Sequence, residues 1–131
     1  MIVFICLSGV SKTVLEGLTN KCKHKVYTPF TKTFPDGEQY LRIEIELDRS
    51  VAVVQSLFPD QDRKLIELYL ALEAISGLNT EISSVVMLYT AYARQDKRFL
   101  QGEPISIKAL YQGLKLFNIG KLITIDVHSP K

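Results

Sequence analysis

The stretch ISSVVML, from Ile82 to Leu88, is a short run rich in apolar and β-branched residues that does not alternate strictly between apolar and polar positions. A strand with one face in solvent would alternate, because successive side chains point to opposite faces of a sheet. A run without alternation is typical of a parallel strand whose two faces are both covered. This stretch therefore predicts an α/β fold.

The segments around this stretch alternate between strand patterns and helix patterns. Short apolar runs predict further strands at 3–7, 26–27, 51–54 and 122–125. Apolar residues three and four positions apart predict helices after the capping residue Ser11, from the cap at Asp60 or Asp62 to Gly77, and from Pro104 to Gly120. Alternating strands and helices indicate βαβ units, so we expect a mostly parallel sheet with helices on both faces.

One segment departs from this alternation. Pro35-Asp36-Gly37 is typical of a turn, and the residues from Tyr40 to Glu46 alternate between apolar and polar. We expect a half-exposed hairpin or flap there.

The length and composition limit the number of domains and indicate a folded protein. A chain of 131 residues is long enough for one hydrophobic core but not for two independent ones. With 47% hydrophobic and 23% charged residues the composition is that of an ordinary globular protein, so disorder is not expected. We expect a single domain over residues 1–131.

The charge and the cysteines exclude several classes of protein. A net charge of +2 is too small for a protein that binds nucleic acid or a membrane surface, so any anion site must be local. Cys6 and Cys22 form no Cys-x-x-Cys motif, and the apolar run from Met1 to Leu7 is too short for a signal peptide. We expect a cytoplasmic protein with reduced thiols.

Polar residues collect where strands of the predicted sheet end. They occur at Ser8–Ser11, Tyr89–Arg98 and Asp126–Ser129. Ligands of open α/β sheets bind beyond the carboxyl ends of the strands. The first of these segments, a glycine between serines, is more often a turn and helix cap than a phosphate cradle.

The second segment is the strongest candidate for a ligand site. Arg94, Lys97 and Arg98 offer local positive charge suited to phosphates. A solvated basic loop is the alternative, and for charge runs it is the commoner case. Tyr89 and Tyr92 weigh against that alternative, because they add planar surface suited to a base or a ribose.

Two further pairs stay open on residue patterns alone. Asp126 and His128 would lie on one side of an extended segment and share a divalent cation such as Mg²⁺, or His128 merely ends a strand. Asp36 and Glu38 are either simple turn residues or groups that reach the ligand of a neighbouring subunit.

Four longer strings share a resemblance. FPDGEQYLRI (34–43), DRKLIELYLALEAI (62–75), YARQDKRFLQGEPISIKAL (92–110) and ITIDVHSP (123–130) resemble, in order and spacing, the N-terminal half of the ribose-phosphate pyrophosphokinases. The string FLQGEPISIK resembles the archaeal-type members more than the typical bacterial ones. The resemblance implies a type I phosphoribosyltransferase-like α/β domain.

The resemblance also implies roles for residues of the polar segments. ATP is expected to bind Arg94, Gln95 and Asp96, with the flap residues Phe34, Asp36, Gly37 and Glu38 completing the adenine site from an adjacent subunit. His128, and more weakly Asp126, are expected to bind Mg²⁺. A homo-oligomer follows from the shared site, and no catalytic side chain is implied in this half.

The implied activity is the transfer of diphosphate from ATP to ribose 5-phosphate, which gives phosphoribosyl diphosphate and AMP. The ribose 5-phosphate loop and the flexible catalytic loop of this family belong to its second half, which these 131 residues do not include. We therefore expect the ATP-side domain of such a transferase, inactive by itself. The alternative is a non-catalytic nucleotide-binding regulatory subunit that associates with a synthase.

Overall fold

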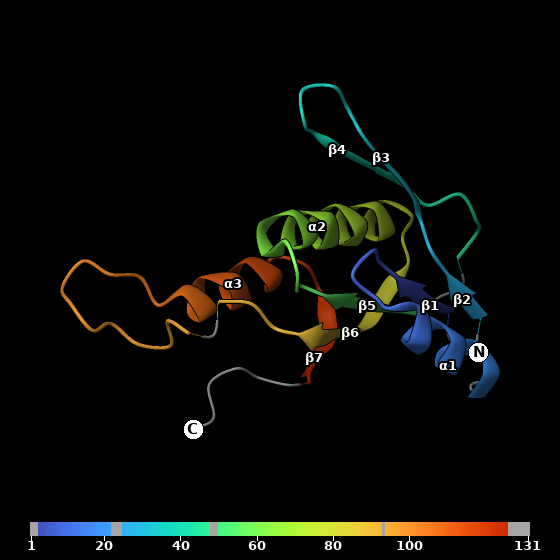
Figure 1. The fold of residues 1–131 in the computed structure, drawn as a ribbon. Helices are drawn as coiled ribbons and strands as arrows, with labels where there is room; N and C mark the ends of the chain where they lie inside the picture. Colours follow the sequence, from blue (N-terminus) through green and yellow to red (C-terminus); the bar gives the residue numbers. More distant parts are fainter. Residues whose placement is uncertain (1–2, 22–24, 48–49, 93, 126–131) are drawn as a thin grey trace.

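A computed structural model describes residues 3–21, 25–47, 50–92 and 94–125. Its main sheet has five parallel strands in the order β2-β1-β5-β6-β7, and a separate antiparallel pair is formed by β3 and β4 (Figure 1). The strands are β1 (Val3–Cys6), β2 (Lys25–Tyr27), β3 (Phe30–Thr33), β4 (Gln39–Arg42), β5 (Ser50–Ser56), β6 (Glu81–Tyr89) and β7 (Ile119–Thr124). The helices are α1 (Lys12–Lys21), α2 (Gln61–Gly77) and α3 (Ser106–Leu114).

Helices cover both faces of the main sheet, as the sequence predicts. The apolar side chains of α2 and α3 pack on one face around Val53, Leu68 and Leu114, which form part of the larger core cluster. On the other face Val14, Leu15 and Leu18 of α1 pack against a smaller cluster. Since burial of apolar surface is the main favourable term in folding, these two layers hold the sheet in place.

The hairpin β3–β4 projects from the body of the molecule beside α2 (Figure 1). Gly37 at its tip has a φ of +99°, a conformation that glycine adopts without strain. Phe30, Phe34 and Tyr40 stack edge to face along it. The predicted flap is therefore confirmed, although its strand β4 ends at Arg42 and its partner β3 gave no strand signal in the sequence.

The prediction for the last helix and the last strand was partly wrong. α3 begins at Ser106 and ends at Leu114, and Gly120 lies inside β7 instead of stopping the helix. A Cβ atom on Gly120 would come within 2.4 Å of the carbonyl oxygen of Ser83, so the close approach of β7 to β6 requires a glycine there. β7 is an outer strand and is partly exposed, whereas the sequence predicted a buried strand.

The predicted helix caps had mixed outcomes. The Ser11 hydroxyl accepts a hydrogen bond from the backbone N–H of Val14 at 3.2 Å, which confirms the cap of α1. Asp60 occupies the N-cap position of α2 with a φ of 64°, but its side chain makes no capping hydrogen bond. The backbone N–H groups in the first turn of α2 therefore receive no side-chain cap from Asp60, and they have no partner within the helix.

The order of the strands changes direction between β1 and β5, because β2 lies on one side of β1 and the later strands lie on the other. A network of polar side chains links the loop after β1 to β5 and α2 at this point. Glu67 of α2 accepts hydrogen bonds from the backbone N–H and the hydroxyl of Ser8 and from the side-chain amide of Gln55. The amide oxygen of Gln55 in turn accepts the N–H of Gly9 at 2.8 Å. A Cβ on Gly9 would lie 2.0 Å from the carbonyl oxygen of Ser56, so the loop after β1 sits directly on the end of β5.

Candidate functional site

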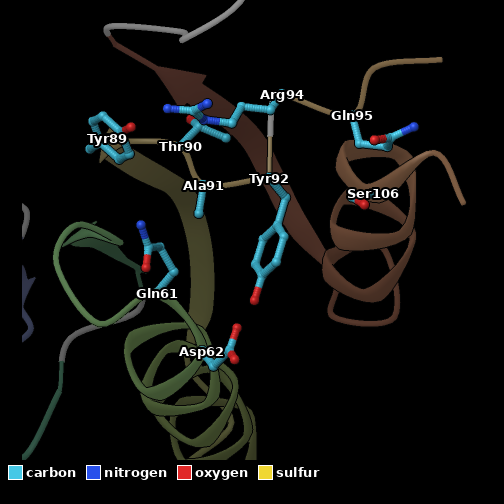
Figure 2. Close-up of a pocket in the computed structure, with 9 residues that line it drawn as sticks. All are labelled: Gln61, Asp62, Tyr89, Thr90, Ala91, Tyr92, Arg94, Gln95 and Ser106. Atoms are coloured by element: carbon cyan, nitrogen blue, oxygen red, sulfur yellow. The ribbon is translucent and has the colours of Figure 1, made fainter. Parts of the chain in front are cut away.

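A cavity of about 360 Å³ lies beyond the carboxyl end of β6 (Figure 2). It is bounded by the beginning of α2, by the segment that follows β6 and by the beginning of α3. The lining residues are Gln61, Asp62, Tyr89, Thr90, Ala91, Tyr92, Arg94, Gln95 and Ser106. The position agrees with the rule that ligands of parallel α/β sheets bind at the ends of the strands.

Backbone hydrogen bonds on both sides of β6 hold the end of this strand, which borders the cavity. The N–H of Leu57 donates to the carbonyl of Tyr89 at 3.0 Å, and the N–H of Ile125 donates to the carbonyl of Met87 at 2.9 Å. The chain then turns at Tyr92, which has a left-handed φ of 68°. Backbone conformations that are rare for bulky residues concentrate at functional sites.

Thr90 is the most unusual residue of the lining. It is 1% exposed, and its buried hydroxyl oxygen has no hydrogen-bond partner among the described residues. A buried polar group without a partner is costly, so such groups are rare in folded proteins and call for an explanation. In Figure 2 the Arg94 side chain extends toward Thr90, while Asp62 lies across the cavity near the Tyr92 hydroxyl.

The structure separates the polar residues that the sequence placed together in one loop. Arg94 and Gln95 line the cavity, as do Tyr89 and Tyr92. Asp96 lines a different hollow, between α3 and β7. Neither of the other two cations reaches the cavity, because Arg98 donates to the carbonyl of Glu103 at 3.0 Å and Lys97 lies over the ring of Phe99. Among the described residues Arg94 alone supplies positive charge to the lining.

The flap residues do not contribute to this cavity within one chain. Phe34, Asp36, Gly37 and Glu38 form the turn of the β3–β4 hairpin, where the N–H of Phe34 donates to the carbonyl of Glu38 at 2.7 Å. The carboxylate of Asp36 accepts the N–H of Glu38 at 3.0 Å, which is ordinary turn chemistry. A role for these residues in the site of a second copy stays a prediction.

The predicted metal ligands Asp126 and His128 lie outside the described residues. Within residues 3–21, 25–47, 50–92 and 94–125 the structure contains no cluster of three or more histidine, cysteine, aspartate or glutamate side chains that could hold a metal ion. The last described residue, Ile125, is hydrogen-bonded to β6 at the same edge of the sheet as the cavity.

Several residues of the site were missed by the sequence analysis. Gln61, Thr90 and Ser106 line the cavity, and Asp62 was considered only as a helix cap. These residues line the cavity because the beginnings of α2 and α3 lie beside the end of β6 in the folded chain. No local pattern of residues in the sequence predicts that arrangement. The only usable signal was the general rule that helix N-termini gather at this edge of a parallel sheet.

No helix in the described part of the chain is long and apolar enough to cross a membrane. Cys6 is a free thiol buried in β1, and burial raises its pKa to about 11. A thiol with a raised pKa is a poor nucleophile near neutral pH. Cys6 does not line the cavity at the end of β6.

Comparison with known proteins agrees with the resemblance found in the sequence. Residues 4–117 match the family model described as the N-terminal domain of ribose phosphate pyrophosphokinase. The ribose-phosphate pyrophosphokinase of Methanopyrus kandleri is 42% identical over 97 residues, which cover 74% of this chain and 33% of the relative. That of Sulfurisphaera tokodaii is 40% identical over 127 residues, which cover 93% of this chain and 44% of the relative.

A solved structure supports the fold. The phosphoribosylpyrophosphate synthetase from Mycobacterium smegmatis superimposes with a TM-score of 0.87 at 20% sequence identity, over 98% of this chain and 44% of that protein. At this identity the likeness is evidence for the fold alone. The chain spans between a third and a half of the length of these relatives.

Proposed function

The chain belongs to the ribose phosphate pyrophosphokinase family, and we propose that it forms the ATP-binding half of such an enzyme. The reaction of the complete enzyme would be the transfer of diphosphate from ATP to ribose 5-phosphate. The supporting observation is the cavity at the end of β6, which combines Arg94 and Gln95 with the beginning of α2 and with the buried hydroxyl of Thr90, which has no partner in the described part of the chain.

The lining suits a nucleotide. A guanidinium group forms charge-assisted hydrogen bonds with phosphate oxygens, so the phosphates are expected beside Arg94. Asp62 lies away from Arg94, so the two ends of the cavity differ in charge (Figure 2). Tyr89 and Tyr92 offer aromatic surface on which a base or a ribose can pack.

Mg²⁺ is part of the proposal. Asp126 and His128 are the residues that we expect to hold it, with a carboxylate oxygen and an imidazole nitrogen as donors, and magnesium proteins commonly use few protein ligands beside substrate phosphates. The ion would neutralise the charge of the triphosphate. The proposed work of this chain is to position ATP, because phosphoryl-type transfer depends mainly on positioning and electrostatic stabilisation.

We propose a homo-oligomer in which the flap of one copy completes the site of another. Phe34 is 37% exposed at the tip of the hairpin and lies under the ammonium group of Lys32. An exposed aromatic side chain on a projecting hairpin is suited to covering a base. A cytoplasmic location, also proposed, is in keeping with the free thiol of Cys6.

ATP binding by the purified chain tests the central part of the proposal. ATP at about 100 times its Kd should stabilise the folded state by about 2.7 kcal/mol, which raises Tm by about 10 °C for a chain of this length. Arg94→Ala should weaken binding about 10- to 150-fold, the usual effect of losing a charged hydrogen bond. Lys12→Ala in α1 removes the same charge from a residue that does not line the cavity and should leave Kd unchanged. Equal affinity of Arg94→Ala and the wild-type chain would refute the assignment.

The alternative, a non-catalytic regulatory subunit, shares the ATP site and differs in the reaction. We expect no release of AMP by these 131 residues alone. AMP should appear when the remaining half of a family member is supplied, if the chain is part of an enzyme. A chain that binds ATP but never supports turnover would favour the regulatory subunit.

A further inference from the structure

One side chain organises the loop that follows the cavity. Oε1 of Glu103 accepts the backbone N–H groups of Phe99 at 3.0 Å and Leu100 at 3.1 Å. The same oxygen accepts Nε2 of Gln95 at 3.1 Å. The backbone N–H of Glu103 donates to the carbonyl of Leu100 at 3.2 Å, and its carbonyl accepts Nε of Arg98. Glu103 therefore closes the loop from both its side chain and its backbone.

The contact with Glu103 fixes which atom of the Gln95 amide stays available to a ligand. Nε2 of Gln95 donates a second hydrogen bond, to the carbonyl of Lys97 at 2.9 Å. Both partners are acceptor oxygens, so the amide nitrogen, and not the amide oxygen, must occupy this position. Its two hydrogens are then both used. The atom that Gln95 retains for a ligand is its amide oxygen, which can only accept.

Holding Gln95 in advance has an energetic consequence. A glutamine side chain has many rotamers, and ordering it when a ligand binds would oppose binding. A side chain that the protein already holds in place avoids most of that cost. Gln95 lines the cavity from an otherwise exposed loop, so a support such as Glu103 is needed to keep it ordered.

We propose that Glu103 is a positioning residue of the nucleotide site. It holds the amide nitrogen of Gln95, so that the amide oxygen is the atom left to a ligand, as a hydrogen-bond acceptor. The ligand group opposite Gln95 is then a donor, a hydroxyl or an amino group, and not a phosphate oxygen. This inference rests on the proposed function, because the ligand is taken to be ATP.

A double-mutant cycle tests whether Glu103 acts through Gln95. ATP affinity is measured by calorimetry for the wild-type chain, Gln95→Ala, Glu103→Ala and the double variant. Each single change should weaken binding about 5-fold, the worth of one net hydrogen bond. Because both changes remove the same interaction, that of Gln95 held by Glu103 with the ligand, the double variant should bind no more than about 2-fold more weakly than either single variant. Losses that multiply to about 25-fold would overturn the inference.

Two matched variants separate positioning from general destabilisation. Glu103→Gln keeps an acceptor oxygen at the same place and should bind ATP within about 2-fold of the wild-type chain. Glu81→Ala removes an exposed glutamate at the opposite end of β6 and should have no effect on ATP binding. Equal weakening by Glu103→Gln and Glu103→Ala would contradict the role of the acceptor oxygen.

A measurement without nucleotide completes the test. In Glu103→Ala the backbone amides of Phe99 and Leu100 and the side-chain amide of Gln95 should show increased mobility in ¹⁵N relaxation, with Tm nearly unchanged. Unchanged order in the loop would refute the role of Glu103. A wild-type chain that does not bind ATP would refute the proposed function and this inference with it. ATP binding that is equally tight in Glu103→Ala would refute this inference alone.

Discussion

Removal of the Glu67 carboxylate is expected to destabilise the fold by about 2–4 kcal/mol. Glu67 is only 4% exposed, and its carboxylate accepts three hydrogen bonds, two from Ser8 and one from Gln55. In Glu67→Ala the fully buried Gln55 loses a partner that water cannot replace, which costs about 1–3 kcal/mol. Ser8 is exposed, so water replaces its lost partner and the added cost is about 1 kcal/mol.

This loss would be a large part of the 5–15 kcal/mol by which domains of this kind are stable. The free energy of unfolding is measured from urea titrations followed by circular dichroism. The variants are compared with the same slope m of the free energy of unfolding against urea concentration. Glu67→Gln keeps the size of the side chain and one acceptor oxygen, so about 1 kcal/mol should be lost. Glu73→Ala changes an exposed glutamate of the same helix and should cost less than about 0.5 kcal/mol. A Glu67→Ala variant within about 1 kcal/mol of the wild-type chain would refute the reasoning, because each hydrogen-bonded group was assigned at least that much.

Two further predictions concern the site and the core. Thr90→Val should stabilise the ligand-free chain by about 1–3 kcal/mol, because it removes a buried hydroxyl that has no partner among the described residues, and Tm should rise by about 4–10 °C. Thr80→Val at the other end of β6 is the control, and a lower Tm for Thr90→Val would show that the hydroxyl is bonded in solution. Burial raises the pKa of Cys6 from 9.0 to about 11, so above pH 9 the unfolded chain ionises this thiol while the folded chain does not. Stability should therefore fall between about pH 9 and 11, more steeply in the wild-type chain than in Cys6→Ala, and parallel curves of urea midpoint against pH would contradict this.

The fold was predictable where one local pattern decides the structure. The apolar run of β6, which does not alternate, predicts a strand covered on both faces, and the spacing of apolar residues in α2 predicts a helix with one buried face. The hairpin tip at Gly37 was equally clear from turn chemistry. In each case the local preference agrees with the packing, so the sequence alone is sufficient.

The errors occurred where packing overrides a local preference. Gly120 is typical of a helix end, but the contact of β7 with β6 uses it in a strand. Phe117 continues the apolar spacing of α3, yet the helix has ended at Leu114 and the ring packs on Tyr69. Asp60 is typical of a cap, but its left-handed backbone is not the extended conformation from which a capping side chain normally bonds.

The candidate site was half predictable for a similar reason. Arg94 and Gln95 were identified from their motif, and the structure places both at the cavity. The motif could not show that Arg98 is bound to Glu103 or that Asp96 lines another hollow, since both facts depend on the course of the loop. The supporting role of Glu103 depends on hydrogen-bond geometry, which residue types do not encode.

The outer position of β7 affects how association of this chain should be interpreted. One side of β7 is hydrogen-bonded to β6, and no other strand of the described residues pairs with its second side. Ile123 and Ile125 at this border are 40% and 50% exposed. Unprotected strands of this kind join to one another across molecules and so promote aggregation. A dimer of the isolated chain in solution can therefore arise by strand addition at β7. Only an association that changes at Phe34 abolish, with β7 intact, would support the proposed nucleotide site shared between copies.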